Sequence, residues 1–329
     1  MSQTMRAAVL EHYGRPLRVV SVPRPEPGPG QVLVRIKASG TNPLDLKIAE
    51  GAAPHARQAA PAILGLDMAG VIEAVGPGVH AFKPSDEVYG MVGGVGGVQG
   101  TLAEFAAVDA DLIAVKPASL SFREAAILPL VVITAWEGLV DRMQVKAGQS
   151  VLVIGGAGGV GRVVVQLGRA FGGKLYATGS DADRQAIEEA GATFIDRNEA
   201  VADYIGRCTE ERGFDLVYDT VGGSGLDDAF AAIGKFGHVT SALGWGTHAL
   251  APLSFKAATY SGIFTLMPLL SGEGRRHHGK ILREAAQLVE GGKLSPRLHG
   301  EHFTLETAND AYRAIADGRA KGKIAIDIN

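Results

Sequence analysis

The sequence predicts an α/β protein in which a doubly wound parallel sheet is joined to a smaller β-rich unit. From Gln149 to Thr265, apolar runs typical of buried strands alternate with segments of helical spacing. A glycine-rich turn connects the first of these strands to the first helix. Residues 1–128 instead contain short strand-like runs separated by proline and glycine, a pattern typical of a distorted, partly open barrel.

Composition restricts the class of protein. The chain has 329 residues, of which 46% are apolar and 20% charged, and this favours two domains with a substantial core. A net charge of −3 provides no basic field for nucleic acid or an anionic membrane. Cys208 is the only cysteine, which excludes an intrachain disulfide and any multi-cysteine metal site. No apolar run approaches the ~20 residues that span a bilayer, and residues 1–10 lack a signal-peptide pattern, so we expect a cytoplasmic protein.

The β-rich unit contains strand-like runs and connections that exclude helix. Residues 22–30 alternate proline and glycine with other residues and cannot be helical. Residues 93–100 are mostly glycine, which predicts a flexible loop or, alternatively, the mobile edge of an active site. We expect strands at Ala7–Leu10, Val32–Ile36, Gly65–Val75 and Asp86–Met91.

The second unit follows a predicted helix over Phe122–Leu139. Its expected strands are Val151–Ile154, Lys174–Thr178, Phe194–Ile195, Asp215–Asp219, Gly237–Ala242 and an edge strand at Ser261–Thr265. The pattern changes after Pro268, where two amphipathic helices precede a terminal strand at Ile324–Ile328. We expect this tail to return to the β-rich unit. The predicted domains are therefore 1–128 with 266–329, and 129–265.

The glycine turn predicts a dinucleotide site. Gly156, Gly158 and Gly161 give the pattern G-x-G-x-x-G between a strand and a helix that begins near Val160. Glycine lets the backbone turn tightly and lets a diphosphate approach, and the helix start offers free N–H groups and partial positive charge. The alternative is a glycine-rich turn without a ligand. The residues expected at the cofactor are Gly156, Ala157, Gly158, Gly159, Val160 and Gly161.

The end of the second strand of this unit favours NADPH over NADH. Folds that prefer NAD carry a carboxylate there, which accepts from the ribose 2′-hydroxyl. This chain has Thr178, Gly179 and Ser180, followed by Arg184 one helical turn later. A hydroxyl and a guanidinium bind a 2′-phosphate, whereas a carboxylate repels it. We expect Asp181 to cap the following helix; the alternative for Arg184 is a solvated helix residue.

Several motifs together resemble one family over essentially the whole chain. They are Gly40–Asp45 (G-x-N-x-x-D), Gly65–Gly70, Asp86–Gly90, the Leu128–Trp136 segment carrying Thr134, Gly155–Gly161, and Gly322–Ile324. In this combination they resemble the medium-chain dehydrogenase/reductase superfamily. The resemblance implies a Rossmann domain and a GroES-like catalytic domain.

The positions that bind zinc in that superfamily show which of its branches the chain resembles. Zinc-dependent members ligate zinc through Cys, His and Cys, and the matching positions here are Asn42, Leu66 and Leu130, which cannot hold zinc. The four cysteines of the structural zinc lobe are absent as well. The chain therefore resembles the zinc-independent quinone oxidoreductase branch, which includes zeta-crystallin. This resemblance implies NADPH, a quinone or α,β-unsaturated carbonyl substrate, no metal, and a homodimer formed through the Ser261–Thr265 edge strand.

The resemblance also assigns positions around the cofactor. It places Asn42 and Thr134 near the nicotinamide and Gly158–Val160 at the diphosphate. The remaining positions are Thr178, Gly179, Ser180, Arg184 and Arg197 around the adenosine phosphate, Val221 at the adenosine ribose, and Ala242, Leu243 and Gly244 beside the nicotinamide.

Three residues are expected to act in catalysis. Without a strong Lewis acid, a conjugated acceptor is the favoured substrate, because it spreads the developing charge and weaker donors suffice. We expect Asn42, Lys47 or Thr134 to hold the acceptor oxygen during direct hydride transfer, and water or one of them to give the proton. Lys47 stands where well-known quinone reductases have tyrosine, which leaves enals and enones equally open; the alternative is a solvated lysine. The second hypothesis is an NADPH-binding sensor or structural protein with little catalysis.

Overall fold

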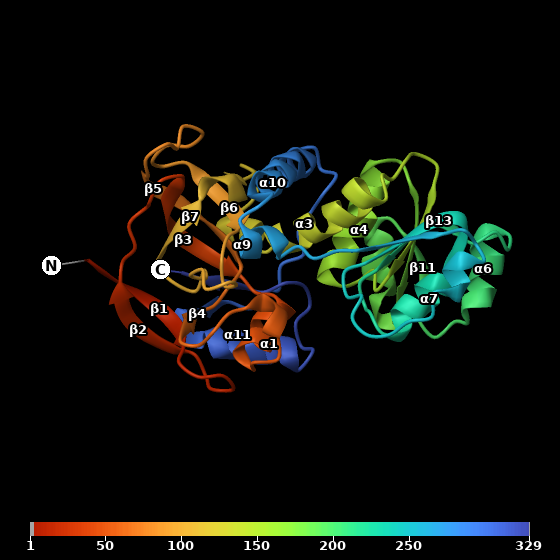
Figure 1. Cartoon of the computed structure of the whole chain (residues 1–329), viewed down its shortest axis with the longest axis horizontal. Coiled ribbons are helices and arrows are strands. Elements are labelled where there is room, and N and C mark those ends of the chain that lie inside the picture. Colours follow the sequence, from red (N-terminus) through yellow and green to blue (C-terminus); the bar gives the residue numbers. More distant parts are fainter. Residues whose placement is uncertain (1–2, 329) are drawn as a thin grey trace. The chain divides into compact units, whose positions relative to one another are not determined.

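The computed structural model describes residues 3–328 and divides the chain into two units (Figure 1). The barrel unit comprises the chain up to Leu130 together with the segment from Leu266 onward, and the sheet unit comprises Val131–Thr265. The first division falls two residues after the predicted boundary at residue 128. Within the described residues, no helix combines the length and apolar character needed to cross a bilayer.

The barrel unit holds two sheets. Its strands are β1 (Thr4–Leu10), β2 (Arg18–Pro23), β3 (Gln31–Gly40), β4 (Ala62–Ile63), β5 (Asp67–Val75), β6 (Glu87–Met91), β7 (Phe105–Asp109), β8 (Ile113–Val115), β15 (Phe303–Thr304) and β16 (Ala325–Asp327). One sheet has the order β2-β1-β4, and the other has the order β15-β16-β3-β5-β6-β8 with β7 also paired to β3. The four strands expected from the sequence are found as β1, β3, β5 and β6.

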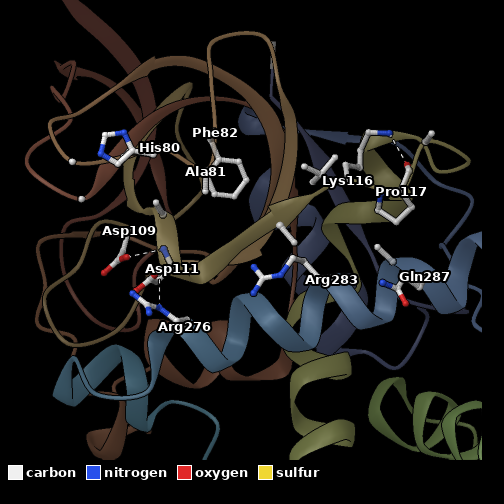
Figure 2. Close-up of a pocket in the computed structure, with 18 of the residues that line it drawn as sticks. His80, Ala81, Phe82, Asp109, Asp111, Lys116, Pro117, Arg276, Arg283 and Gln287 are labelled. Carbon is white, nitrogen blue, oxygen red and sulfur yellow. Dashed lines mark hydrogen bonds and ion pairs between the residues drawn. The ribbon is translucent and has the colours of Figure 1, made fainter.

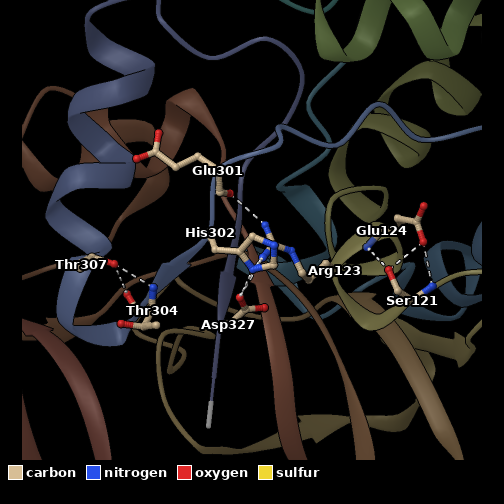
Figure 3. Close-up of polar contacts among 8 residues, drawn as sticks. All are labelled: Ser121, Arg123, Glu124, Glu301, His302, Thr304, Thr307 and Asp327. Atoms are coloured by element: carbon tan, nitrogen blue, oxygen red, sulfur yellow. Dashed lines mark hydrogen bonds and ion pairs between the residues drawn. The ribbon is translucent and has the colours of Figure 1, made fainter.

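The C-terminal tail returns to the barrel unit, as expected. Strand β16 pairs antiparallel with β3, so Ile326 lies opposite Ser39. Helix α2 (Phe122–Ala126) holds the same tail through Arg123, which donates to the Asp327 carboxylate at 2.9 Å and to the Glu301 carbonyl at 3.0 Å (Figure 3). The other helices of this unit are α1 (Pro43–Ala49), α9 (Met267–Ser271), α10 (Arg275–Glu290) and α11 (Ala308–Ala316).

The single helix expected over Phe122–Leu139 is wrong. The structure has α2, then α3 (Pro129–Trp136), then a π-helical segment at Glu137–Arg142. The break falls before Pro129, because proline has no N–H for the helix ladder and disfavours helical backbone in the residue before it. A π-helical turn is rare and often occurs at functional positions.

The glycine-rich segment at residues 93–100 is packed rather than loose. Residues 91–95 are buried, and Gly96 and Gly97 are exposed. A Cβ atom at Gly93 would lie 1.9 Å from the Gln99 carbonyl oxygen, so another part of the segment passes directly against it. The glycines here allow close backbone packing, and the expected flexible loop is not what the structure shows.

The sheet unit is a six-stranded parallel sheet. Its strands are β9 (Ser150–Ile154), β10 (Lys174–Gly179), β11 (Thr193–Asp196), β12 (Phe214–Asp219), β13 (Ile233–Ser241) and β14 (Thr259–Gly262), in the order β11-β10-β9-β12-β13-β14. Its helices are α4 (Gly159–Ala170), α5 (Arg184–Ala190), α6 (Val201–Thr209), α7 (Ser224–Ala232) and α8 (Ala251–Ser254). Helix α4 packs on β9 and β10, and α7 packs on β12 and β13. The predicted doubly wound sheet is thus confirmed.

The chain reverses its direction of winding between β9 and β12. In such sheets, ligands bind beyond the carboxyl ends of the strands at this point. The edge strand after β13 is β14, at Thr259–Gly262 rather than at the expected Ser261–Thr265. Its ladder ends with the pair Ser241↔Gly262, because β13 itself ends at Ser241.

Candidate functional site

The glycine turn lies between β9 and α4, at the point where the winding reverses. Gly158 is the N-cap of α4 and has no side chain to bond the first N–H groups of the helix. A Cβ at Gly161 would lie 2.1 Å from the Gly155 carbonyl oxygen, and one at Gly156 would lie 2.4 Å from the Ala177 Cβ. These two glycines therefore let the helix start pack against the turn and against β10. The result is an unobstructed helix N-terminus, which fits a diphosphate.

The end of β10 differs in one respect from expectation. Ser180 forms a capping box with Asp183, whose Oδ2 accepts from the Ser180 N–H at 3.0 Å and from its hydroxyl at 2.5 Å. The expected cap, Asp181, instead pairs with Arg184, with Oδ1 3.1 Å from Nε. A capping box needs its acid at the third helical position, and Asp183 occupies it. The predicted role of Asp181 was wrong.

Two arginines lie around this strand end with different surroundings. Arg184 bonds Asp181 and stacks over the Phe194 ring at 4.1 Å. The backbone N–H of Arg197 donates to the Gly179 carbonyl at 2.9 Å, which places Arg197 beside the strand end. Arg197 is exposed, and within residues 3–328 its guanidinium makes no hydrogen bond or ion pair. Arg197 is therefore the more available cation for a phosphate.

A buried carboxylate that sequence analysis missed organises the other half of the sheet edge. Asp219, at the carboxyl end of β12, is fully buried. Its Oδ1 accepts from the N–H groups of Val221 and Gly222 at 2.9 and 3.0 Å, and its Oδ2 accepts from the Ser241 hydroxyl at 2.6 Å. Ser241 in turn accepts from the Leu243 N–H at 3.0 Å. Asp219 thus fixes the predicted cofactor positions Val221 and Leu243, and its place after an apolar strand was the available signal.

Thr134 joins a second network of the sheet unit. Its Oγ1 lies 3.1 Å from the Oγ1 of Thr265, which donates to Glu137 Oε2 at 3.0 Å. The Tyr218 hydroxyl donates to the Thr134 backbone carbonyl at 2.7 Å. Thr134 and Thr265 are both buried. Neither Thr265 nor Glu137 was singled out from the sequence.

The barrel unit holds a buried polar cluster around Asn42. The Asn42 Nδ2 donates to Asp67 Oδ2 at 3.0 Å, and its Oδ1 accepts from the Lys323 ammonium. The Leu130 backbone N–H donates to Asp67 Oδ1 at 3.0 Å, and the Asn42 N–H donates to Asp45 Oδ2 at 2.8 Å. Asn42 is 1% exposed. Asp67 therefore joins Asn42 and Leu130, two of the three positions that match the zinc ligands of zinc-dependent dehydrogenases.

The acids of this cluster hold their protons unusually tightly. Burial raises the pKa of Asp45 to about 7, against the opposing effect of the Asn42 N–H. Burial also raises the pKa of Asp67 to about 6, although the Lys323 ammonium lowers it. Burial lowers the pKa of Lys323, and the two carboxylates oppose that change. Burial therefore raises the pKa of both acids of the cluster above that of a free aspartate.

The remaining predicted residues are exposed to different degrees. Lys47 lies exposed on α1. Thr178 is buried and accepts from the Gly155 N–H at 3.1 Å, and Gly244 is exposed after β13. Asn42 and Lys47 belong to the barrel unit, whereas Thr134 and the cofactor positions belong to the sheet unit.

A hollow of about 1300 Å³ on the barrel unit includes none of the predicted site residues (Figure 2). Arg283 and Gln287 of α10 line it, with Phe82 and Lys116. Lys116 pairs with Glu87 at 3.1 Å.

The residues present fit a nicotinamide dinucleotide and do not fit a catalytic zinc. The open helix start of α4 and the cation of Arg197 match a diphosphate and a further phosphate. Asn42, Leu66 and Leu130 offer no zinc ligand set. Among the described residues, no three His, Cys, Asp or Glu side chains gather as metal ligands do.

Comparisons with known proteins agree with this arrangement. Residues 28–118 match the family model of the alcohol dehydrogenase GroES-like domain, and residues 190–326 match that of zinc-binding dehydrogenases. The chain is 34% identical to a 2-methylene-furan-3-one reductase of Solanum lycopersicum, over 90% of this chain and 71% of the relative. It is 32% identical to a chloroplastic NADPH-dependent alkenal/one oxidoreductase of Arabidopsis thaliana, over 92% of this chain and 73% of the relative.

Solved structures give the same picture. An alcohol dehydrogenase superfamily protein of Novosphingobium aromaticivorans is 55% identical, with a TM-score of 0.98 over 99% of this chain and 100% of that one. A mycobacterial quinone oxidoreductase is 26% identical, with a TM-score of 0.85 over 98% of this chain and 99% of that one.

A parallel sheet with a glycine turn at its reversal point, in the same chain as a GroES-like unit, defines a two-domain nicotinamide-dependent dehydrogenase or reductase. The chain belongs to the medium-chain dehydrogenase/reductase superfamily, in its quinone oxidoreductase branch.

Proposed function

We propose that this chain is an NADPH-dependent reductase of α,β-unsaturated carbonyl compounds or quinones, and that it works without a catalytic metal. The observation that carries the proposal is the open glycine turn at the start of α4, in a chain whose positions for zinc hold Asn42, Leu66 and Leu130. The names of the two plant relatives support the substrate class, since both describe reductases or oxidoreductases of enones and enals.

The chain's own residues bind and orient in this proposal. The N–H groups at the start of α4 hold the diphosphate, and Arg197, with Arg184 beside it, receives the 2′-phosphate. When bound, the nicotinamide supplies a hydride to the conjugated acceptor. The exposed ammonium of Lys47 binds the acceptor oxygen, where negative charge develops, and water or Lys47 gives the final proton. The side-chain amide of Asn42 donates to Asp67 and accepts from Lys323. In this proposal Asn42 positions the start of α1 and does not contact the substrate.

The proposal also includes a preference for NADPH over NADH. The chain has no acid in the last position of β10, which is Gly179, and this supports a 2′-phosphate. Asp183 is the opposing feature, because its Oδ2 would lie 3.5 Å from a Cβ at Gly179. Its two hydrogen bonds from Ser180 occupy this oxygen and lower its capacity to accept from a ribose.

Turnover tests the proposal. The purified chain is mixed with NADPH or NADH and a panel of enals, enones, quinones and saturated ketones. We expect NADPH oxidation with conjugated acceptors and little with saturated ketones. Tight NADPH binding without oxidation by any acceptor would instead support the sensor or structural hypothesis, and a preference for saturated ketones would contradict the proposal.

We also propose that two copies associate through β14. This strand is one of the two edge strands of the parallel sheet, and its residues Thr259, Tyr260 and Gly262 are exposed, which supports pairing with a symmetry mate. Sedimentation equilibrium tests this: a dimer is expected, and a Tyr260→Pro variant, which removes an edge N–H, should sediment as a monomer. The cytoplasmic location expected from the sequence stays a prediction.

A further inference from the structure

One wall of the hollow on the barrel unit is a single face of α10. Arg276, Arg283 and Gln287 line it at helical spacing. Figure 2 shows these side chains along α10, and Phe82 on the loop that forms the opposite wall. Every lining residue belongs to the barrel unit, and none of them is assigned above to the cofactor or to the substrate. With a volume of about 1300 Å³, the hollow is large enough for a small organic molecule.

Most charged groups of the hollow are already paired. Three ion pairs contribute side chains to its lining, with nitrogen–oxygen distances of 2.8 Å for Arg275–Asp109, 3.6 Å for Arg276–Asp111 and 3.1 Å for Lys116–Glu87. The exposed guanidinium of Arg283 makes no hydrogen bond or ion pair within residues 3–328. Glu290 accepts from the Ser119 backbone N–H at 3.1 Å and has no partner cation within the same residues. With His80 counted as neutral, the lining therefore holds one unpaired cation and one unpaired acid.

The unpaired guanidinium lies where α10 meets the barrel. A Cβ at Gly279 would lie 2.6 Å from the Asp111 carbonyl oxygen, so the helix touches the backbone after β7 at this residue. The same Cβ position lies 3.4 Å from Nη1 of Arg283. Gln287 follows one helical turn later, and its side-chain amide makes no hydrogen bond among the described residues. Two sets of available N–H donors therefore stand on neighbouring turns of one helix face.

The rest of the lining is largely apolar. Val115, at the end of β8, is 56% exposed and lines the hollow. Phe82 lies on the wall opposite α10 (Figure 2), and alanine, valine, glycine and proline supply most of the remaining surface. A ligand that covers these groups removes apolar area from water. A few available polar groups beside such a surface are typical of a site for a small molecule.

These groups select for a singly charged acid with an apolar chain. A guanidinium donates two parallel hydrogen bonds to a carboxylate. Glu290 lies about 10 Å along α10 from Arg283, so a second negative charge at that end of a ligand is repelled. We propose that the hollow binds an aliphatic monocarboxylate whose oxygens accept from Arg283 and Gln287. Its chain lies along Phe82 and Val115. The inference goes beyond the proposed function and does not depend on it.

Calorimetry with three probes tests the chemistry of the ligand. Dissociation constants of hexanoate, octanoate and octan-1-ol are measured with the full chain. Octanoate should bind at least threefold more tightly than hexanoate, since each buried methylene contributes up to about fourfold. Octan-1-ol should bind at least about fivefold more weakly than octanoate, because it lacks the charge that Arg283 binds. Equal binding of octanoate and octan-1-ol would contradict the proposal.

Variants of the lining test its location. Arg283→Met removes the guanidinium and should weaken octanoate at least about fivefold while changing octan-1-ol less than twofold. Arg283→Lys keeps the charge without the paired donors, and its affinity should fall between the two. Lys280→Met is the matched control, because Lys280 is an exposed cation of α10 outside the hollow; it should change octanoate binding less than twofold. Val115→Thr, of similar shape with a hydroxyl, should weaken octanoate about twofold.

A dicarboxylate tests the opposite end of the site. Octanedioate should bind the wild type at least about fivefold more weakly than octanoate, because its second carboxylate meets Glu290. Glu290→Gln keeps an oxygen for the Ser119 N–H and removes the charge. This variant should narrow the difference between the two probes at least twofold, and an unchanged difference would contradict the assigned orientation.

The outcomes separate this inference from the proposed function. Absence of octanoate binding, or binding that Arg283→Met leaves unchanged, overturns the inference. Equal losses in Arg283→Met and Lys280→Met show only a general attraction to positive charge and overturn it as well. Failure to oxidise NADPH with any acceptor overturns the proposed function and leaves this inference standing. Circular dichroism and thermal melting confirm that each variant is folded.

Discussion

The Lys323 ammonium donates to the side-chain carbonyl of Asn42, although the two residues lie 281 positions apart. The bond joins the tail segment before β16 to the loop before α1. It also brings one cation to two buried carboxylates, Asp45 and Asp67, both of which interact with Lys323 electrostatically. The tail therefore completes the polar cluster at the loop that carries Asn42.

Removal of this cation should destabilise the barrel unit. A Lys323→Met variant loses a hydrogen bond from a charged group and leaves two carboxylates without a partner cation, so we expect a loss of ~2–3 kcal/mol in the free energy of unfolding. Denaturant unfolding measures the loss. Lys321→Met, at an exposed lysine of the same segment, is the control and should change stability by less than ~0.5 kcal/mol. Equal effects of the two variants would contradict the account.

Stability should depend on pH through Asp45. Its pKa rises from 3.8 to about 7 on folding, so the folded state binds the proton more tightly between these values. The group therefore favours folding most below pH ~4, and this contribution is lost as pH rises to ~7. The Asp45→Asn variant keeps an acceptor for the Asn42 N–H and cannot ionise. Its melting temperature should fall less than that of the wild type between pH 5 and pH 8.

Over the same pH range, the free energy of unfolding of the wild type should fall by on the order of 2–4 kcal/mol more than that of Asp45→Asn, since one pKa unit corresponds to about 1.4 kcal/mol. Asp67, whose pKa is raised to about 6, adds a decline in the same direction over a narrower window. The exposed Asp317 provides the control, because Asp317→Asn should follow the wild-type pH dependence. A wild-type melting temperature that rises from pH 5 to pH 8 relative to Asp45→Asn would contradict the burial argument.

The two glycines of the turn separate folding from binding. A Cβ at Gly158 would lie 3.4 Å from the Gly155 carbonyl oxygen, an ordinary contact, whereas one at Gly161 would lie 2.1 Å from the same atom. Gly158→Ala should fold normally and bind NADPH at least tenfold more weakly, because its methyl group stands at the helix start. Gly161→Ala should melt at a lower temperature. Calorimetry and thermal melting distinguish these results, and normal binding by Gly158→Ala would contradict the diphosphate site.

Arg197 should decide the preference for a phosphorylated cofactor. Arg197→Ala should weaken NADPH binding by about 1.5–3 kcal/mol, the worth of a hydrogen bond between charged groups, and change NADH binding little. Arg184→Ala should cost less, because Asp181 already pairs with Arg184. Arg207, paired with Glu199 at 2.7 Å, is the control for loss of a surface arginine. Fluorescence titration with both cofactors checks these values; equal losses for NADPH and NADH would end the assignment.

The parts of the site that could be predicted are those encoded by residues close together in the sequence. The glycine turn is local, and its place between a buried strand and a helix followed from apolar patterns on either side. The Ser180–Asp183 capping box is also local, and its pattern of Ser followed by an acid three residues later was available. It was missed because Asp181 is the acid that directly follows the strand.

Other parts depend on contacts that no local pattern encodes. The bond from Lys323 to Asn42 and the bond from Ser241 to Asp219 join segments that only the sheet topology brings together. The network from Thr134 through Thr265 to Glu137 requires the π-helical segment, which periodicity at 3.6 residues cannot predict. The break before Pro129 was predictable from the proline alone.

Turnover by metal-free protein tests the central claim most directly. The chain is dialysed against a chelator, its zinc content is measured, and NADPH oxidation is followed with an enone and with a quinone. The account predicts that protein containing almost no zinc keeps its full rate, because Asn42, Leu66 and Leu130 do not form a zinc ligand set. Loss of activity on chelation, with recovery on adding one equivalent of zinc, would contradict it.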